Sequence, residues 1–386
     1  MSSSASDVSD AVTGSAAPSV RFTAATPDDD AAIRRLLRRT PMPGDVTIGY
    51  EREPSFFRSL TPMGEETQVA VGRPADAPER VVALGCRTLR EAFVDGEPQR
   101  VEYLSQMRVD PDYRGQGLVE QGFRTIRDWH EADPVPFSYA TITAENPAAR
   151  KRLVNQSTGA TPSFRPLADL HTLALVLRRR RLQRPTTPPD VTITRGPTDL
   201  DAVAAFLREA GRDRPFFPVY RAEDFESDAT LGFDPNNLLV ARRNGQIVGT
   251  LGLWDVSGHK QTVVRGYRGP LRWTRPLVNA GLRLAGARPL PDPGEPLRSV
   301  YASIACTAPG HADAYVALLE AAYRRAATTD AAFLIVGGAE DDPLLDAARA
   351  YPHLSYRSTL YTVHWTDALR RPSLDARPPV VEFATL

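Results

Sequence analysis

The stretch from Met107 to Val119 constrains the fold of this chain more than any other; it reads Met-Arg-Val-Asp-Pro-Asp-Tyr-Arg-Gly-Gln-Gly-Leu-Val. A run rich in strand-forming residues, 101–109, ends just before a proline, and two glycines follow within one turn. An amphipathic segment then begins, with Val119, Phe123 and Ile126 at helical intervals. A strand that leads through glycines into a helix is suited to holding phosphate, because free N–H groups and the positive end of the helix face one point.

Two glycines alone would be equally typical of a strand-to-helix turn that binds nothing. The longer motif is more specific. Residues 114–119 read Arg-Gly-Gln-Gly-Leu-Val, which closely resembles the pyrophosphate loop of the GNAT superfamily of N-acetyltransferases. That loop has Arg or Gln, two residues, Gly, one residue, then Gly or Ala, and Val119 departs from it only at the last position. The resemblance implies a GNAT fold that uses acetyl-CoA.

The resemblance also implies which residues contact the coenzyme. In the family, the backbone of the strand before the loop binds pantetheine, the loop amides hold pyrophosphate, and an Asn-x-x-Ala motif opens the next helix. The expected coenzyme-binding residues are therefore Met107, Arg108, Val109, Arg114, Gly115, Gln116, Gly117, Leu118 and Asn146, with Ala149 completing the last motif.

Glu102 is the expected catalytic base, because it lies on the strand before the loop, near the glutamate of histone-type members of the family. Partial burial would raise its pKa to a useful value. An outward-facing glutamate in an ion pair is an equally weighted alternative. The tyrosine that serves the family as general acid is replaced by Leu153. Tyr139, or else Tyr103, is the expected substitute, although a buried strand tyrosine is usually structural and a thiolate can also leave unaided.

The second half of the chain repeats the first. Phe22-Thr23 recurs as Ile193-Thr194, and the strand 300–306 corresponds to 101–109. We therefore predict an α/β (α+β) protein of two tandem GNAT-type folds, each a mixed, mostly antiparallel sheet flanked by helices. The expected parts are a disordered N-terminus (1–18), a catalytic domain (19–178), a linker rich in Arg and Pro (179–190), a degenerate second domain (191–368) and a tail (369–386).

The second copy is expected to bind no coenzyme. Gly310-His311-Ala312-Asp313 stands in place of the loop, and its Asp313 would repel a pyrophosphate. An insertion, 257–296, carries Lys260 and an amphipathic run, 277–284. This insertion could cover the cleft of the first domain or pack on its own core, and we favour packing.

Composition excludes several classes of function. The 47 basic residues balance the 47 acidic ones, which favours neither nucleic acid nor an anionic membrane as a partner. No run is apolar and long enough for a membrane helix. The two cysteines, Cys86 and Cys306, lie in apolar runs, which predicts buried free thiols in a reducing cytoplasm. The histidines lack the spacing of a metal site, so no metal is expected.

The leading hypothesis is an N-acetyltransferase that transfers acetyl directly from acetyl-CoA to an amine in the N-terminal domain. The C-terminal domain would be structural and shape the acceptor site. A non-catalytic acyl-CoA-binding or interaction protein is the main alternative, and an O-acyltransferase is another. The acceptor is a small molecule or peptide amine whose identity stays open, as do the oligomeric state and the acyl group.

Overall fold

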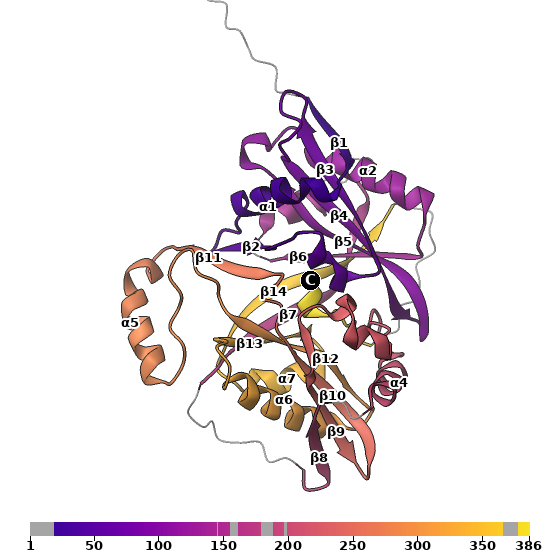
Figure 1. Cartoon of the computed structure of the whole chain (residues 1–386), viewed down its shortest axis with the longest axis vertical. Coiled ribbons are helices and arrows are strands. Elements are labelled where there is room, and N and C mark those ends of the chain that lie inside the picture. Colours follow the sequence, from indigo (N-terminus) through magenta and orange to yellow (C-terminus); the bar gives the residue numbers. More distant parts are fainter. Residues whose placement is uncertain (1–18, 145, 155–160, 179–187, 197–198, 366–376) are drawn as a thin grey trace, which may run out of the picture.

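The computed structural model describes residues 19–144, 146–154, 161–178, 188–196, 199–365 and 377–386 (Figure 1). The expected disordered segment 1–18, most of the expected linker and the beginning of the expected tail lie outside the described residues.

Fourteen strands are found among the described residues. In chain order they are β1 (Val20–Ala24), β2 (Val46–Glu51), β3 (Glu66–Pro74), β4 (Ala83–Val94), β5 (Glu97–Val109), β6 (Phe137–Thr143), β7 (Ser163–Val176), β8 (Val191–Arg195), β9 (Phe233–Arg243), β10 (Gln246–Trp254), β11 (Gln261–Tyr267), β12 (Ser299–Thr307), β13 (Phe333–Ala339) and β14 (His353–His364).

The described α-helices are α1 (Asp30–Arg39), α2 (Leu118–Ala132), α3 (Pro147–Leu153), α4 (Leu200–Gly211), α5 (Leu271–Leu284), α6 (Ala312–Ala326) and α7 (Pro343–Arg349). Short 3-10 turns complete the described structure at Pro27–Asp29, Arg58–Met63, Pro111–Tyr113, Ala222–Glu226, Asp228–Thr230 and Phe383–Thr385.

Twelve strands form one continuous sheet in the order β1-β3-β4-β5-β6-β14-β7-β13-β12-β10-β9-β8. The two halves exchange their last strands: β14, from the second half, pairs with β6, and β7, from the first half, pairs with β13. Within the sheet, β5–β6 and β12–β13 are the parallel pairs, and the other neighbours are antiparallel. The mixed, mostly antiparallel α/β architecture in two similar halves is therefore confirmed, with the addition that the halves share one sheet.

Helices cover both faces of this sheet. In the first half, α2 packs on β1, β3 and β4, and in the second half α6 packs on β9, β10 and β12. Apolar side chains of α2, including Phe123 and Ile126, are buried against the sheet, as their helical spacing predicts. In Figure 1, β1, β3, β4 and α2 of the first half lie in the upper part, and β9, β10, β12 and α6 of the second half lie in the lower part.

The segment 43–58 contains β2, which pairs with β11 of the insertion in a separate two-stranded sheet. One sequence expectation about this insertion is wrong. The amphipathic run 277–284 was expected to pack on its own core. It belongs to α5, which projects from the body (Figure 1), and its Leu277 and Leu284 side chains are 75% and 78% exposed. The pairing of β2 with β11, which sets Glu51 opposite Gln261, joins residues far apart in the sequence and so leaves no local signal.

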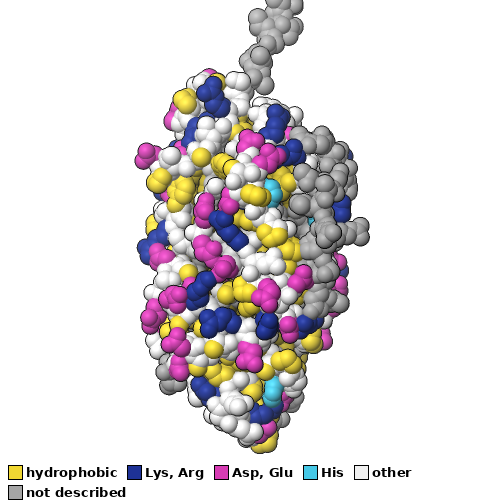
Figure 2. All heavy atoms as spheres, turned by 90° about the vertical axis from the view of Figure 1, so that its right-hand side faces the viewer, with side chains coloured by type: hydrophobic (Ala, Val, Ile, Leu, Met, Phe, Trp, Pro, Cys, Tyr) yellow, Lys and Arg dark blue, Asp and Glu magenta, His cyan; other side chains and the backbone are white. Residues whose placement is uncertain are grey.

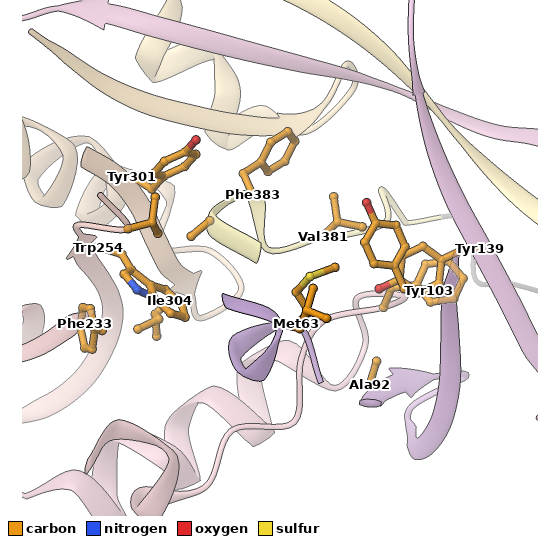
Figure 3. Close-up of a cluster of buried hydrophobic side chains, with 14 of the residues drawn as sticks. Met63, Ala92, Tyr103, Tyr139, Phe233, Trp254, Tyr301, Ile304, Val381 and Phe383 are labelled. Carbon is orange, nitrogen blue, oxygen red and sulfur yellow. The ribbon is translucent and has the colours of Figure 1, made fainter. Parts of the chain in front are cut away.

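The largest core cluster joins the halves (Figure 3). Tyr103 and Tyr139 come from the first half, and Tyr301 comes from the second. Val381 and Phe383, from the last described segment, belong to the same cluster and lie between these groups in Figure 3. Residues 377–386 thus end inside the molecule, where Figure 1 marks the C-terminus.

Candidate active site

A cavity of about 290 Å³ passes through the sheet of the first half. It opens where β5 and β6 diverge, since their parallel ladder runs from Val101 and Phe137 only to Leu104 and Ala140. Gln106 lies at this point with φ +56° and forms a bulge in β5 that breaks its register with β4. Met107, Arg108, Val109, Leu118 and Asn146, all expected from the sequence to bind the coenzyme, line the cavity.

The loop 114–117 lies beside one end of this cavity, between Val109 and Leu118 of its lining. Gly115 and Gly117 have φ values of +82° and +72°, a conformation that glycine adopts without strain. The backbone amides of Gly115, Gln116 and Gly117 donate no backbone hydrogen bond to any described residue. Amides that have no backbone acceptor among the described residues, at the N-terminus of a helix, are the arrangement that favours phosphate binding.

The carboxylate of Glu120 lies near this helix end, and its negative charge is balanced by Arg152. Glu120, in the first turn of α2, accepts hydrogen bonds from Arg152 of α3 at 2.6 and 2.7 Å. The pair ties α2 to α3 on the side of the cavity where Asn146 caps α3, its Oδ1 accepting from the Ala149 amide at 3.1 Å. Asn146 therefore orients α3 through its side chain while it lines the cavity.

The opposite end of the cavity carries positive charge. Arg52 follows β2 and is 5% exposed; its Nη1 donates to the carbonyl and hydroxyl oxygens of Ser59 at 3.0 and 3.2 Å. Arg108 donates to its neighbour's carbonyl, Met107 O, at 2.9 Å. Lys260, from the insertion, donates to Ala384 O at 3.1 Å and Leu386 O at 2.5 Å. Burial lowers the pKa of Arg52 to about 10 and that of Lys260 to about 7.

Glu102 does not line the cavity. It is fully buried and accepts hydrogen bonds from Arg87 Nε at 3.1 Å and Ser138 Oγ at 2.6 Å, and its Oε2 lies 2.8 Å from His130 Nδ1. Burial acts to raise its pKa, but the contacts with His130, Ser138 and Arg87 outweigh it, so the pKa lies below its usual value. This is the opposite of the shift that the sequence argument required. The surroundings of Glu102 are those of a structural ion-pair network rather than of a base.

Tyr139 also lies away from the cavity. Its ring stacks on Tyr103 at a centroid distance of 5.0 Å, and burial raises its pKa. Tyr103, the alternative acid, does line the cavity, and its hydroxyl lies 3.1 Å from Thr141 Oγ1. Burial raises the pKa of Tyr103 to about 12, so it is protonated at neutral pH and can donate a proton or a hydrogen bond.

Both cysteines are free and buried, as expected. Cys86 lines the cavity beside Arg52 and Arg108. Burial nevertheless raises the pKa of its thiol to about 12, so it is not the thiolate that a covalent mechanism would need.

The corresponding region of the second half is filled. Residues 379–383 line the small space of about 50 Å³ beside β12 and β13. Glu382 Oε2 accepts from the Ile304 amide at 3.0 Å and from the Tyr220 hydroxyl at 3.2 Å. In the degenerate loop, the carboxylate of Asp313 accepts a hydrogen bond from Arg243 at 2.6 Å. In the described part of the second half, this space is much smaller than the cavity of the first half, and the carboxylate of Asp313 stands at the corresponding loop.

The end of the cavity that holds Arg52, Arg108 and Lys260 is called the chamber below. Two of these residues, Arg52 and Lys260, were not anticipated from the sequence. No sequence motif points to Arg52, and Lys260 belongs to an insertion whose role the sequence left open. They meet because β2 pairs with β11, with Val264 opposite Ile48. Lys260 also lies over the ring of Tyr301, 5.3 Å from its centroid. The scarcity of lysine, with Lys151 and Lys260 alone in the sequence, was the one available signal.

Within the described residues no helix is long and apolar enough to cross a membrane. The same residues contain no group of three or more His, Cys, Asp or Glu side chains placed to hold a metal ion. On the face shown in Figure 2, basic and acidic side chains are interspersed, and its described residues form no continuous basic strip.

The structure is similar to several solved structures. One is a GCN5-related N-acetyltransferase from Sphaerobacter thermophilus, with 18% identity, a TM-score of 0.55, and 95% of this chain and 98% of that chain covered. Another is a tandem GNAT protein from the clavulanic acid biosynthesis pathway, with 13% identity, a TM-score of 0.53, and coverage of 91% and 100%. A third is N-myristoyltransferase from Saccharomyces cerevisiae with bound myristoyl-CoA, with 11% identity, a TM-score of 0.59, and coverage of 96% and 84%.

These similarities show that the chain has a tandem GNAT-type fold. No model of a protein family matches the sequence, and neither does any of the curated proteins compared with it.

Proposed function

We propose that the chain is an acyltransferase that moves an acetyl group from acetyl-CoA to an amine in the cavity of its first half. The observation that carries the proposal is the continuity of the cavity. It begins beside three unused loop amides at the N-terminus of α2, follows the divergence of β5 and β6, and ends in a chamber walled by both halves. The neighbouring structures include a protein with bound myristoyl-CoA and two named as acetyltransferase or GNAT proteins.

The described residues suggest how each part of acetyl-CoA would be held. Pyrophosphate would accept hydrogen bonds from the amides of Gly115, Gln116 and Gly117. Pantetheine would lie along Met107 to Val109, where β5 has lost β6 as a neighbour. The thioester would then lie near the Gln106 bulge, between the coenzyme end and the chamber.

The reaction requires a neutral amine. Its nitrogen attacks the thioester carbonyl carbon, the carbon–sulfur bond breaks, the nitrogen loses one proton, and the thiolate gains one. Arg52, Arg108 and Lys260 disfavour a further positive charge in the chamber, so they lower the pKa of an ammonium bound there. We assign Tyr103, which lines the cavity and is protonated at neutral pH, as the donor to the leaving thiolate, and the proton that the nitrogen loses restores its phenol.

The test measures free thiol released from acetyl-CoA over a panel of amines and alcohols, with the acetylated product identified by mass spectrometry. The proposal expects amine-dependent thiol release that is lost in Gly117→Trp, since a large side chain at φ +72° displaces the loop. Coenzyme binding without thiol release from any acceptor would favour the non-catalytic alternative, and products formed only from alcohols would favour O-acyl transfer.

A further inference from the structure

We infer that the acceptor carries a carboxylate, which binds at Arg108 and Arg52 in the chamber. This inference rests on the proposed function and adds the chemical class of the acceptor: a small amino acid or a similar molecule with an amine and a carboxylate.

The chamber walls carry a positive charge. Among the described residues that line the cavity, three side chains are cationic: Arg52, Arg108 and Lys260. Glu51 is the one carboxylate side chain in that described lining, and it is already paired with Arg265 of β11. A buried positive charge is costly unless an anion or several hydrogen bonds compensate it.

The positive charges of Arg52 and Arg108 have no carboxylate partner among the described residues. Neither Arg52 nor Arg108 lies within 4.0 Å of a carboxylate among the described residues. Arg52 uses Nη1 on Ser59, and Arg108 uses Nη1 on Met107 O. Each guanidinium carries five N–H donors in a planar fork, so most of this donor capacity has no acceptor in the described structure. Burial lowers the pKa of both groups, as expected for cations without a full set of partners.

A buried arginine nearby differs from these two. Arg87, which is fully buried, is paired with Glu102 and donates to Gln68 and to Asp133 O. The chain therefore supplies partners to a buried arginine where the arginine is structural. The two chamber arginines differ from it in facing a cavity, where a ligand can provide the acceptors. A carboxylate is the anion that matches the guanidinium fork through two parallel hydrogen bonds.

The carboxylate lies on the acceptor rather than on the coenzyme. Arg52 lies near Tyr301 of the second half and near Lys260 of the insertion, so this end of the cavity is the one remote from the loop at Gly115 to Gly117. The phosphates have their own donors at that loop. An acceptor entering between the halves would meet Arg52 first and present its amine toward the Gln106 bulge.

The experiment compares each amino acid of a panel with the amine that lacks its carboxylate, such as phenylalanine with 2-phenylethylamine and lysine with cadaverine. We expect kcat/KM to be at least about tenfold higher for the carboxylate-bearing member, mostly through KM, because a charge-assisted hydrogen bond contributes on this scale. Arg108→Gln should abolish the difference. Arg100→Gln is the matched control on the same strand, since Arg100 is ion-paired with Glu66 and Asp133 outside the cavity.

Equal rates for both members of each pair would overturn the inference, as would a preference that survives Arg108→Gln. An Arg108-dependent preference for succinyl-CoA over acetyl-CoA with neutral amines would place the carboxylate on the acyl group and overturn the acceptor assignment. Arg108→Met serves as a second variant. Since it removes a half-buried charge that has no carboxylate partner among the described residues, the melting temperature of the free protein should stay unchanged or rise, whereas a fall would indicate a structural arginine.

A binding measurement separates this inference from the proposed function. N-acetylphenylalanine should bind the full chain by calorimetry at least about tenfold more tightly than N-acetyl-2-phenylethylamine, and Arg108→Gln should remove the difference. Such a result supports the carboxylate site even if no acceptor is acetylated. The converse, amine acetylation with no Arg108-dependent carboxylate preference, supports the proposed function and overturns this inference.

Discussion

Gln106 and Ile304 hold the same left-handed backbone conformation, with φ +56° and +53°, at corresponding bulges of β5 and β12. Each bulge lies beside a parallel pair that diverges, β5–β6 in one half and β12–β13 in the other. Gln106 lines the open cavity, whereas the Ile304 amide donates to Glu382 of the last described segment. The two halves therefore share the same bulge in the strand before the helix, and in the second half the last described segment covers this bulge.

We predict that acetyl-CoA binds once per chain, in the first half. Gly117→Trp should weaken coenzyme binding at least about a hundredfold, because the φ of +72° and the approach of the phosphate both require glycine. Gly310→Trp is the matched control, since Gly310 has φ +81° at the corresponding loop of the second half. Calorimetric titration measures both. Two equivalent sites in the unmodified chain, or a loss of binding in Gly310→Trp, would contradict the prediction.

A second prediction separates the two buried tyrosines. Tyr103→Phe should lower kcat about a hundredfold with little change in coenzyme affinity, because general acid catalysis contributes at least on that scale. Tyr139→Phe should change kcat by less than about threefold, since its side chain lies outside the cavity lining. Single-turnover kinetics with saturating acetyl-CoA measures the chemical step. Equal effects of the two substitutions would mean that both rings act only through packing.

The sequence was sufficient to locate the glycine loop and the strand before it, but it did not show which side chains line the cavity. Gly115 and Gly117 mark the loop because few residues adopt φ near +80°. The position of Glu102 outside the cavity lining could not be foreseen, because strand alternation shows which residues share a face but not which face opens to the cavity. The bulge at Gln106 shifts the register between β4 and β5, so a count along β5 does not carry across it. Arg52 reaches the chamber through the distant pairing of β2 with β11, which no local pattern announces.

A third prediction concerns Glu102. Glu102→Gln should lower the free energy of unfolding at pH 7 by about 3–5 kcal/mol, because Arg87 would lose its buried ionic partner. Glu97→Gln, an exposed position on the same strand, should change it by less than about 0.5 kcal/mol. Urea denaturation followed by circular dichroism provides both values. A large loss of turnover with unchanged stability would restore Glu102 as a catalytic residue.

The pH dependence of that difference has a defined sign. The pKa of Glu102 in the folded chain lies below its ordinary value of 4.5. Its ionised form therefore stabilises the fold fully above about pH 4.5, and the contribution is lost as the pH falls through the folded-state pKa. The gap between the unmodified chain and Glu102→Gln should narrow steadily below pH 4.5. A gap that widens on acidification would show that the carboxyl is bound in its protonated form.

The last prediction is that the two halves unfold as one unit. Strand β14 lies between β6 and β7, so it contributes its hydrogen bonds to the sheet of the first half although it belongs to the second half of the sequence. Leu360 of β14 is fully buried in the cluster that joins the halves. Leu360→Ala should destabilise the whole chain by about 2–5 kcal/mol, since it opens a cavity in a shared core.

Calorimetry should therefore give one transition whose van't Hoff and calorimetric enthalpies agree. The rate of amide hydrogen exchange at pH 7 should rise in Leu360→Ala in both β6 and β13, although β6 pairs directly with β14 and β13 does not. Leu277→Ala on α5 is the control, because its side chain is 75% exposed and its removal should change neither half. Two separate transitions, or faster exchange confined to one side of the sheet, would show that the strand exchange joins the halves without making them cooperative.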